Sequence, residues 1–565
     1  MRKHPVAMSL ALLAGVAAAG LLFGPAGLRN EPQSAQAALL NEAKQITGVS
    51  RLFGWSVAVS GDTAVAGARY DQALLLNAGA AFVFERDQGG ADNWGEVMKL
   101  TASDAQAHDE LGYSVAISGD TVVVGAFGKD SGGTRAGAAY VFDRNEGGAD
   151  NWGEVTKLTA SDAQTGDQFG ESVAVSGDTV VVGAHHEDAG GSDAGAVYVF
   201  QRDQGGADNW GEVTKLTASD AQAGDELGYS VAVSGDTAVV GAHHEDAGGS
   251  KAGAAYVFDR NEGGANNWGE VTKLTASDAE TFDRFGYSVA VNAVTAVVGG
   301  PREDAGGDGA GAAYVFERDE GGADNWGEVT KLTASDAQAG DQFGASVTVS
   351  GDTAVVGANH EDAGASDAGA AYVFDRNEGG AGTWGELSKL TASNAASSDW
   401  FGFSAGVSGG TAVLGAPQTE GQDDTLGTVY IFEIPLPKDQ ATDTDGDTIA
   451  NSADLDDDND GCTDKQEING DPRLGGRRNP HNPWDFYDVL GPGAALPIDG
   501  VIDLPNDILG VIQHHPAGTL GYDAQFDRGS WTGPNSWNDT QGPDGVIDLP
   551  NDILGVLLQF GHSCQ

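Results

Sequence analysis

The chain has 565 residues, of which 40% are hydrophobic and 11 are tryptophan, and its 84 acidic against 29 basic residues give a formal net charge of −55. The charge repels phosphate backbones and anionic lipid headgroups, so nucleic acids and membrane surfaces are excluded as expected partners. The chain is longer than a single domain with one hydrophobic core, so we expect at least two folded units. The apolar content argues against a disordered chain.

The N-terminus has the pattern of an export signal. Basic residues at 2–4 precede an almost wholly apolar run at 6–23, and Ala35-Gln36-Ala37 has the form of a cleavage site. We therefore predict a signal peptide over residues 1–37 and a secreted protein, extracellular or at the cell surface, with no membrane span after cleavage. The alternative is a retained N-terminal anchor, which the shortness of the apolar run disfavours.

A repeat fills the middle of the chain. Each unit opens on a Phe-Gly or Leu-Gly pair, and each pair follows the last by 58 residues. The pairs begin at Phe53, Leu111, Phe169, Leu227, Phe285, Phe343 and Phe401. A period of this length is typical of a solenoid, a propeller or an array of domains.

One unit, residues 169–220, distinguishes among these architectures. It holds four short runs rich in β-branched and aromatic residues, separated by Gly, Asp and Asn: Glu171–Ser176, Thr179–Ala184, Ala196–Phe200 and Glu212–Thr217. Four such runs without a helical segment between them predict four antiparallel strands, which is the blade of a β-propeller. Seven units predict an all-β, seven-bladed propeller.

The last unit lacks its fourth run. After Val429–Phe432 the chain continues into a proline-containing segment, whereas Ala43–Thr47, just before the first unit, resembles a fourth strand. We predict that this N-terminal strand completes the seventh blade and closes the ring, which protects the strand edges of an open array. The propeller is thus assigned to residues 38–434.

These units resemble the FG-GAP repeats of integrin α-chains and of bacterial exported proteins. The resemblance rests on the Phe-Gly opener, on the Val-Val-Gly-Ala run at Val181–Ala184 and on Gly195–Phe200. It implies adhesion or binding of an extracellular protein or glycan on the propeller face. Integrin-type blades often carry an Asp-x-Asp-x-Asp-Gly calcium loop, but only Ser-Gly-Asp stands at that place here, as at Ser176–Asp178. We therefore expect no calcium in the blades.

Two features of the blades invite a functional reading. His185–Asp188 and His243–Asp246 look like metal clusters, but neighbouring side chains in an extended loop are expected to point apart, which favours solvated loops. A tryptophan recurs at one position in six of the seven units, and we expect it to pack structurally, with ligand stacking as the alternative. The series is Trp94, Trp152, Trp210, Trp268, Trp326 and Trp384.

Residues 435–480 contain two stretches with calcium-loop spacing. Residues 456–467 match the EF-hand loop, including Gly461 at its sixth position. The predicted Ca²⁺ ligands there are Asp456, Asp458, Asp460, the Cys462 carbonyl, Asp464 and Glu467. The preceding stretch has Thr448 where Gly is expected, and its predicted ligands are Asp443, Asp445, Asp447, Asn451 and Asp454. The pair resembles thrombospondin type 3 calcium repeats. The alternative is a disordered acidic linker.

Residues 481–565 form a second tail unit. Asp499–Val511 recurs almost unchanged as Asp544–Val556. Two copies of Asp-Gly-x-Ile-Asp running into an apolar helix resemble a dockerin module, which implies a small, partly helical unit with a cohesin-like partner. The alternative is a helical pair that packs on itself. Export permits a disulfide between Cys462 and Cys564, and two free thiols are the alternative.

No nucleophile, base and orienting group occur together in the repeats, so no catalytic residue is assigned. The sequence favours an exported, calcium-binding, non-catalytic propeller protein for extracellular binding or adhesion. The alternatives are a secreted polysaccharide hydrolase with its site on the propeller face and a structural surface or matrix component.

Removal of Ca²⁺ is expected to unfold the tail and leave the thermal transition of the propeller nearly unchanged, because bound ions supply folding free energy only in the tail. Melting curves of the whole chain and of residues 438–565, recorded with Ca²⁺ and with chelator, measure this. A propeller transition that moved as far as the tail transition would show that the blades hold ions of their own.

Overall fold

The computed structural model describes residues 40–434, except positions 41, 73, 91–92, 149–150, 205, 207–208, 263, 265–266, 321–324, 380–381 and 418–425. The regular elements in these described residues are all β-strands. The same residues contain no helix long and apolar enough to cross a membrane. The predicted signal peptide, calcium repeats and dockerin-like module lie outside the described residues.

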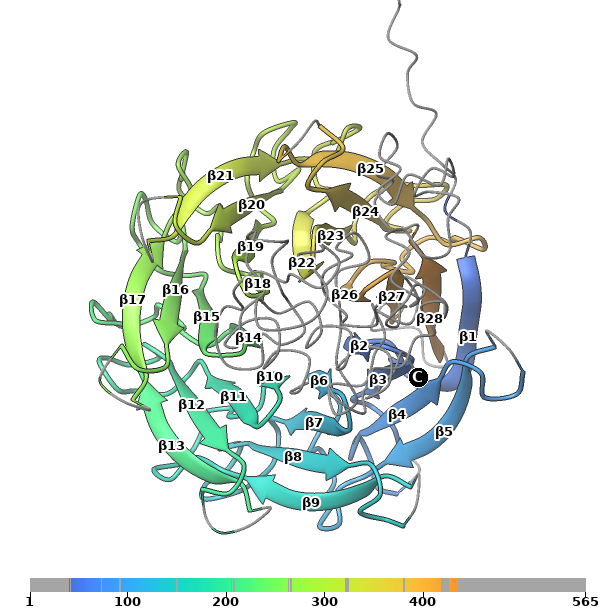
Figure 1. The fold of residues 1–565 in the computed structure, drawn as a ribbon, viewed down its shortest axis with the longest axis vertical. Helices are drawn as coiled ribbons and strands as arrows, with labels where there is room; N and C mark the ends of the chain where they lie inside the picture. The colour runs from blue at the N-terminus through green and yellow to red at the C-terminus, as the bar shows by residue number, and fades with distance from the viewer. Residues whose placement is uncertain are drawn as a thin grey trace, which may run out of the picture. The chain divides into compact units, whose positions relative to one another are not determined.

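Seven antiparallel sheets of four strands surround a central axis, which confirms the predicted seven-bladed propeller (Figure 1). The innermost strands are β2 (Val57–Ser60), β6 (Val115–Ser118), β10 (Ser172–Ser176), β14 (Ser230–Ser234), β18 (Ser288–Val291), β22 (Phe343–Ser350) and β26 (Ser404–Ser408). They begin blades 1 to 7 in that order. The second strands are β3 (Thr63–Ala68), β7 (Thr121–Ala126), β11 (Thr179–Ala184), β15 (Thr237–Ala242), β19 (Thr295–Gly300), β23 (Thr353–Ala358) and β27 (Thr411–Ala416).

The outer half of each blade follows the same order. The third strands are β4 (Ala80–Glu85), β8 (Ala138–Asp143), β12 (Ala196–Gln201), β16 (Ala254–Asp259), β20 (Ala312–Glu317), β24 (Ala370–Asp375) and β28 (Leu426–Glu433). The outermost strands of blades 1 to 6 are β5 (Gly95–Leu100), β9 (Gly153–Leu158), β13 (Gly211–Leu216), β17 (Gly269–Leu274), β21 (Gly327–Leu332) and β25 (Gly385–Leu390).

The N-terminal strand closes the ring, as the sequence predicts. β1 (Glu42–Arg51) is the outermost strand of blade 7 and pairs antiparallel with β28, with Gln45 opposite Tyr430. It is longer than the predicted run of 43–47. The contacts between blades continue across the junction, because Ser393 of blade 6 donates from its backbone N–H to the Glu42 carboxylate, as Ser161 does to Glu212.

Adjacent blades approach so closely that two glycines are required at each contact. A Cβ atom on Gly183 of β11 would lie 2.0 Å from the carbonyl oxygen of Gly228, the glycine of the next opener pair. Gly228 itself has a φ of +90°, which favours glycine. The same carbonyl accepts a 2.7 Å hydrogen bond from the Ser172 hydroxyl. The Phe-Gly and Val-Gly-Ala signatures of the repeat are therefore two halves of one contact between blades.

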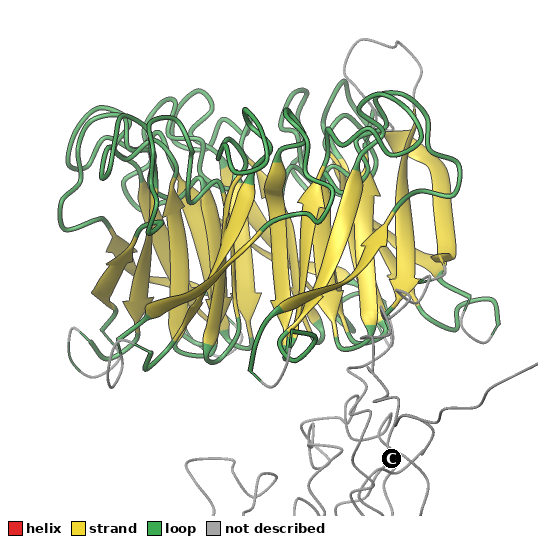
Figure 2. Cartoon of the chain, turned by 90° about the horizontal axis from the view of Figure 1, so that it is seen from above, coloured by secondary structure: helices red, strands yellow, loops and turns green. Residues whose placement is uncertain are grey.

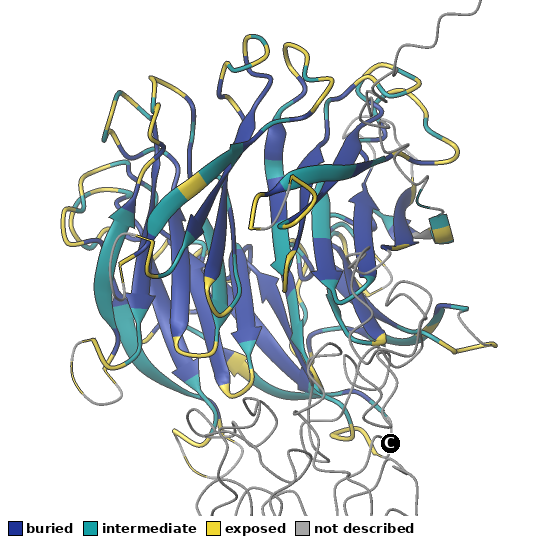
Figure 3. Ribbon diagram, turned by 45° about the horizontal axis from the view of Figure 1, so that its top comes forward, coloured by how far each residue is buried: buried dark blue, intermediate teal, exposed yellow. Residues whose placement is uncertain are grey.

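The hydrophobic core lies between blades rather than within one. All six residues of each second strand are buried, whereas the outermost strands are mainly part-exposed (Figure 3). In the cluster that joins blades 2 and 3, the ring of Phe169 lies edge-on to Tyr198 and Phe200, with centroids 5.5 and 5.9 Å apart. The recurrent tryptophans are buried in these clusters, with Trp210 5% exposed, so the interpretation as structural packing is confirmed.

The two ends of the ring differ (Figure 2). One end, here called the turn face, carries the short turns between innermost and second strands. The other end, the loop face, carries the longer connections from second to third strands and from each outermost strand to the next blade. The last described residue, Ile434, donates its N–H to Gly410 in a turn-face turn. β1 also begins at this end, because it runs antiparallel to β28.

On the turn face, an arginine in each of six blades reaches back to the preceding blade. Arg202 donates to the Asp143 carboxylate at 2.7 Å and to the Thr121 hydroxyl at 2.7 Å. Arg86 makes the equivalent contacts with Glu433 and Thr411 of blade 7. Charge-assisted bonds of this kind are about twice as strong as neutral ones. The six are Arg86, Arg144, Arg202, Arg260, Arg318 and Arg376.

The seam between blades 6 and 7 lacks this arginine, because Ile434 stands at its place in blade 7. Asp375 of blade 6, at the position of Asp143, is 4% exposed, and its Oδ2 has no hydrogen-bond partner in the part of the chain that the structure describes. Burial raises the pKa of Asp375, while a hydrogen bond from the Asn377 N–H opposes that shift. The ionised carboxylate therefore costs stability at neutral pH.

Asp375→Asn is expected to raise the melting temperature at pH 7, by about 1–2 °C, because it removes a buried charge without an arginine partner. The gain should vanish in acid, below the ordinary pKa of an aspartate, where Asp375 is protonated in the folded and unfolded chains alike. Asp143→Asn is the matched variant, and it should lower stability by about 1–3 kcal/mol because Arg202 loses its charged partner. Thermal melts at both pH values test the pair, and two shifts of the same sign would contradict the assignment.

Candidate ligand-binding face

The units differ most in chemistry at four positions beside the opener pair and the second strand. The residue before the pair is Leu52, Glu110, Gln168, Glu226, Arg284, Gln342 or Trp400. The residue after it is Trp55, Tyr113, Glu171, Tyr229, Tyr287, Ala345 or Phe403. The two residues after the second strand are Arg69-Tyr70, Phe127-Gly128, His185-His186, His243-His244, Pro301-Arg302, Asn359-His360 or Pro417-Gln418. In the part of the chain that the structure describes, which excludes Gln418, all four positions fall at the loop-face end of the strands.

The second of these sets gathers around the axis, because each member lies within two residues of the start of the innermost strand of its blade. We call this set the axial ring. The rings of Phe403 and Trp55 have centroids 4.6 Å apart, and those of Trp55 and Tyr113 are 5.6 Å apart. Tyr229 and Tyr287 lie 5.1 Å apart. Side chains from several blades thus touch across the seams and form one surface.

Glu171 is the acidic member of the axial ring. It accepts a 3.1 Å hydrogen bond from the Tyr113 hydroxyl, and its Oε2 lies 3.3 Å from His185 Nδ1. Burial raises the pKa of Glu171 to about 7, although the Tyr113 hydroxyl and the charge of Arg69 act in the opposite direction. Burial lowers the pKa of His185 to about 3, so this imidazole is neutral near pH 7.

Arg69 provides a cation beside the aromatic members of the axial ring. Its guanidinium carbon lies 3.7 Å from the ring centre of Trp55 and 5.3 Å from that of Tyr113. Its Nη1 also lies 3.7 Å from a carboxylate oxygen of Glu110. The site therefore joins aromatic faces to a partly buried charge, a combination suited to ligands with both flat apolar and polar surfaces.

Blade 4 brings two neighbouring histidines together with a carboxylate. His244 Nδ1 lies 3.0 Å from one oxygen of Glu226, and His243 Nε2 lies 3.5 Å from the other. The expectation that neighbouring side chains of these loops point apart into solvent is wrong for blades 3 and 4, because the two imidazoles of each pair lie close together and His185 and His243 are buried. It assumed an extended loop, whereas in blade 4 the chain turns directly after β15, and the two imidazoles are tilted by 39° with centroids 3.9 Å apart.

Sequence reasoning missed the axial ring. The signal was present, since the residue after each opener pair changes from blade to blade while the serine that follows it, as in Ser56 or Ser172, is the same in all seven.

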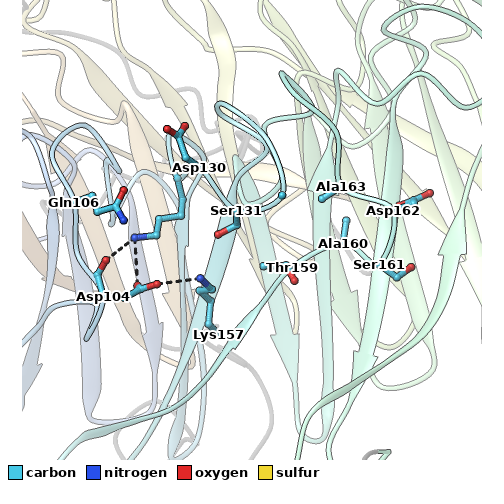
Figure 4. Close-up of a pocket in the computed structure, with 12 residues that line it drawn as sticks. Asp104, Gln106, Asp130, Ser131, Lys157, Thr159, Ala160, Ser161, Asp162 and Ala163 are labelled. Atoms are coloured by element: carbon cyan, nitrogen blue, oxygen red, sulfur yellow. Dashed lines mark hydrogen bonds and ion pairs between the residues drawn. The ribbon is translucent and has the colours of Figure 1, made fainter.

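An open groove lies on the loop face over blade 2, between the connections that lead into and out of this blade, with a cavity volume of about 600 Å³ (Figure 4). Asp104 pairs there with Lys157 at 2.9 Å and with Lys129 at 3.3 Å. Lys129 stands where blades 3 to 6 have glutamate. Because these charges already satisfy one another, we assign the function to the axial ring rather than to this groove.

The predicted calcium ligands, from Asp443 to Glu467, lie outside the described residues, as do Cys462, Cys564 and the dockerin-like repeats. Those predictions remain untested by the structure.

A family model described as FG-GAP repeat matches the chain seven times, once per blade. The matched segments are residues 49–84, 94–142, 152–200, 210–258, 268–316, 326–374 and 384–432. Together they cover more than half of the chain. No curated protein matches it.

The wild-type protein is expected to lose stability as the pH rises, because Glu171 ionises while buried. Glu171→Gln should abolish this loss. In the folded chain the pKa of Glu171 is raised from 4.5 to about 7. The protonated side chain therefore contributes its full stability to the fold below pH 4.5, and this contribution is lost as the pH rises through about 7. The expected difference between wild type and variant is about 3 kcal/mol across this range, measured by denaturant unfolding at several pH values. Tyr113→Phe should enlarge the loss, since it removes the hydroxyl that stabilises the carboxylate. Parallel pH profiles for wild type and Glu171→Gln would contradict the prediction.

Proposed function

Because the chain belongs to the FG-GAP repeat family, we propose that it is a binding or adhesion protein whose ligand docks on the loop face, over the axial ring. The observation that carries the proposal is the placement of the variable side chains. Seven nearly identical blades hold a constant scaffold, and their chemically different residues meet at one end of the axis. Binding residues on a rigid scaffold are commonly arranged in this way.

The chemistry of the axial ring indicates the kind of ligand. Aromatic faces such as Trp55 and Tyr287 stack on sugar rings or on apolar side chains, and Arg69 with Glu171 supplies polar contacts. The strongly acidic chain repels polyanions. An extracellular protein or an uncharged glycan therefore fits better than nucleic acid or a sulfated polymer.

The remainder of the proposal rests on the sequence. The signal-peptide pattern supports export to the extracellular space or the cell surface, and the loops at 443–467 support Ca²⁺ binding in the tail. The dockerin-like repeats support a cohesin-like partner for the tail. The described chain begins and ends on the turn face, so the loop face carries neither of these ends.

A second candidate function is hydrolysis of a polysaccharide on the same face. The raised pKa of Glu171 favours it, because a carboxyl group that titrates near pH 7 can act as a general acid. The two described cavities weigh against it, since neither is lined by Glu171. Binding is therefore the primary proposal and hydrolysis the alternative.

The test is binding to a panel of immobilised polysaccharides and extracellular proteins, measured by biolayer interferometry. Trp55→Ala combined with Tyr287→Ala is expected to weaken binding to the recognised ligand by at least about tenfold, because each loses an aromatic contact. Glu262→Ala, an exposed residue on the turn face, is the control and should leave binding unchanged.

Equal binding by the wild type and the double variant would overturn the proposed face. Release of soluble sugar by the wild type but not by Glu171→Gln, with binding retained, would support the hydrolase instead.

A further inference from the structure

We infer that Glu226, His243 and His244 form a binding site for a divalent transition metal of the zinc class on the loop face of blade 4. One carboxylate oxygen and one nitrogen of each imidazole lie within 4.8 Å of one another, close enough to coordinate a single ion. Two imidazoles and a carboxylate are a ligand set that protein zinc sites use. This inference goes beyond the proposed function and does not depend on it.

Only blade 4 turns its second histidine toward a carboxylate of the opener segment. In blades 3 and 6 the equivalent imidazoles, His186 and His360, lie 2.9 Å from an aspartate in their own loop, Asp193 or Asp367. Blade 4 has Lys251 at that position, which offers no acceptor. His244 is therefore not held by its own loop and points to Glu226 instead.

The carboxylate is specific to blade 4 among the blades with a histidine at this place. Blades 3 and 6 have Gln168 and Gln342 where blade 4 has Glu226. Glutamine is a poorer metal ligand than glutamate because its oxygen carries no charge. Blade 4 thus differs at two positions, Glu226 and Lys251. These differences replace the histidine–aspartate contact of the loop by three metal-donor groups that face one another.

Two further observations point to a ligand. His243 is 3% exposed, and within the described residues its Nδ1 has no hydrogen-bond partner. An unsatisfied buried ring nitrogen is costly, and a metal removes that cost if it coordinates Nδ1 itself, whereas a metal bound through Nε2 fixes the proton on Nδ1. The ring of Tyr229 packs on the imidazole of His243 at a tilt of 44°, with centroids 4.0 Å apart, and Tyr287 meets the imidazole edge-on at 5.7 Å, so the ring is held in place.

The imidazoles are in the protonation state that a metal requires. Burial lowers the pKa of His243 to about 2 and also lowers the pKa of His244, although Glu226 raises the latter. Both are therefore neutral near pH 7, and no proton need be displaced from them when a metal binds.

The surrounding charges select the kind of ion. Lys251 and Arg284 lie close enough to lower the pKa of His244, so the carboxylate of Glu226 shares this site with two cations. A hard ion such as Ca²⁺, held by several carboxylate or carbonyl oxygens, is disfavoured in this setting. Zinc, nickel and copper bind imidazole nitrogen strongly, so these ions need fewer carboxylate ligands and are compatible with the nearby cations. Three protein ligands leave one coordination position for water or for an atom of a ligand on the loop face.

The experiment titrates Zn²⁺ into the full chain by isothermal calorimetry, after chelation and resaturation with Ca²⁺. Histidines and cysteines outside the described residues can also take Zn²⁺, so the variants are compared by the number of equivalents bound. Glu226→Gln, which copies blade 3, and His244→Ala are each expected to lose one equivalent or weaken it by at least about tenfold. His186→Ala in blade 3 is the control and should bind like the wild type.

A converse variant adds a gain-of-function test. Gln168→Glu combined with Asp193→Lys gives blade 3 the residues of blade 4 and should add one equivalent. Circular dichroism and the melting temperature establish that every variant is folded. Equal stoichiometry and affinity in the wild type, Glu226→Gln and His244→Ala would overturn the inference, as would displacement of the bound ion by excess Ca²⁺.

Discussion

The structure depends on how closely the backbones of neighbouring blades approach each other. Each second strand contributes a glycine, such as Gly183, against which the carbonyl of the next opener glycine, Gly228, rests where a side chain would otherwise stand. A methyl group at this point would push the blades apart, and the error would accumulate around the ring. The hydrophobic clusters between blades, the serine bond to the same carbonyl and the arginine contacts of the turn face all require this spacing. It also brings the residue after each opener pair close enough to touch its neighbours.

The strands and the ring closure were predictable because they follow from main-chain periodicity. Alternating β-branched residues and Gly-Asp turns report local backbone geometry, and a missing run at one end with a spare run at the other identifies the closing strand. The site was harder to predict because it depends on side chains from different blades. Tyr113 and Glu171 are 58 residues apart, and nothing local indicates that they share a hydrogen bond. His244 was misjudged since its direction depends on Lys251, seven residues later in its own loop.

The electrostatics of the axial end contrast with those of the whole molecule. The chain as a whole is strongly acidic, yet burial leaves the imidazole of His185 neutral and makes ionisation of Glu171 difficult near pH 7. Arg69 adds a cation among the aromatic rings. The centre of the loop face is therefore nearly neutral and partly apolar within an acidic surround. Such a patch is where a ligand displaces water at least cost, and the surrounding charge keeps copies of the protein apart.

Blade 7 joins the first and last strands of the ring, and this pairing has a mechanical consequence. β1 begins on the turn face and β28 ends there, as neighbours in one antiparallel ladder. Tension between these two ends would pull the strands apart from one edge, so that the hydrogen bonds of the ladder break one after another instead of sharing the load. A force applied across the ring from the loop face to the turn face would instead act along the strands of every blade. The same fold is thus compliant to one direction of pulling and stiff to the other.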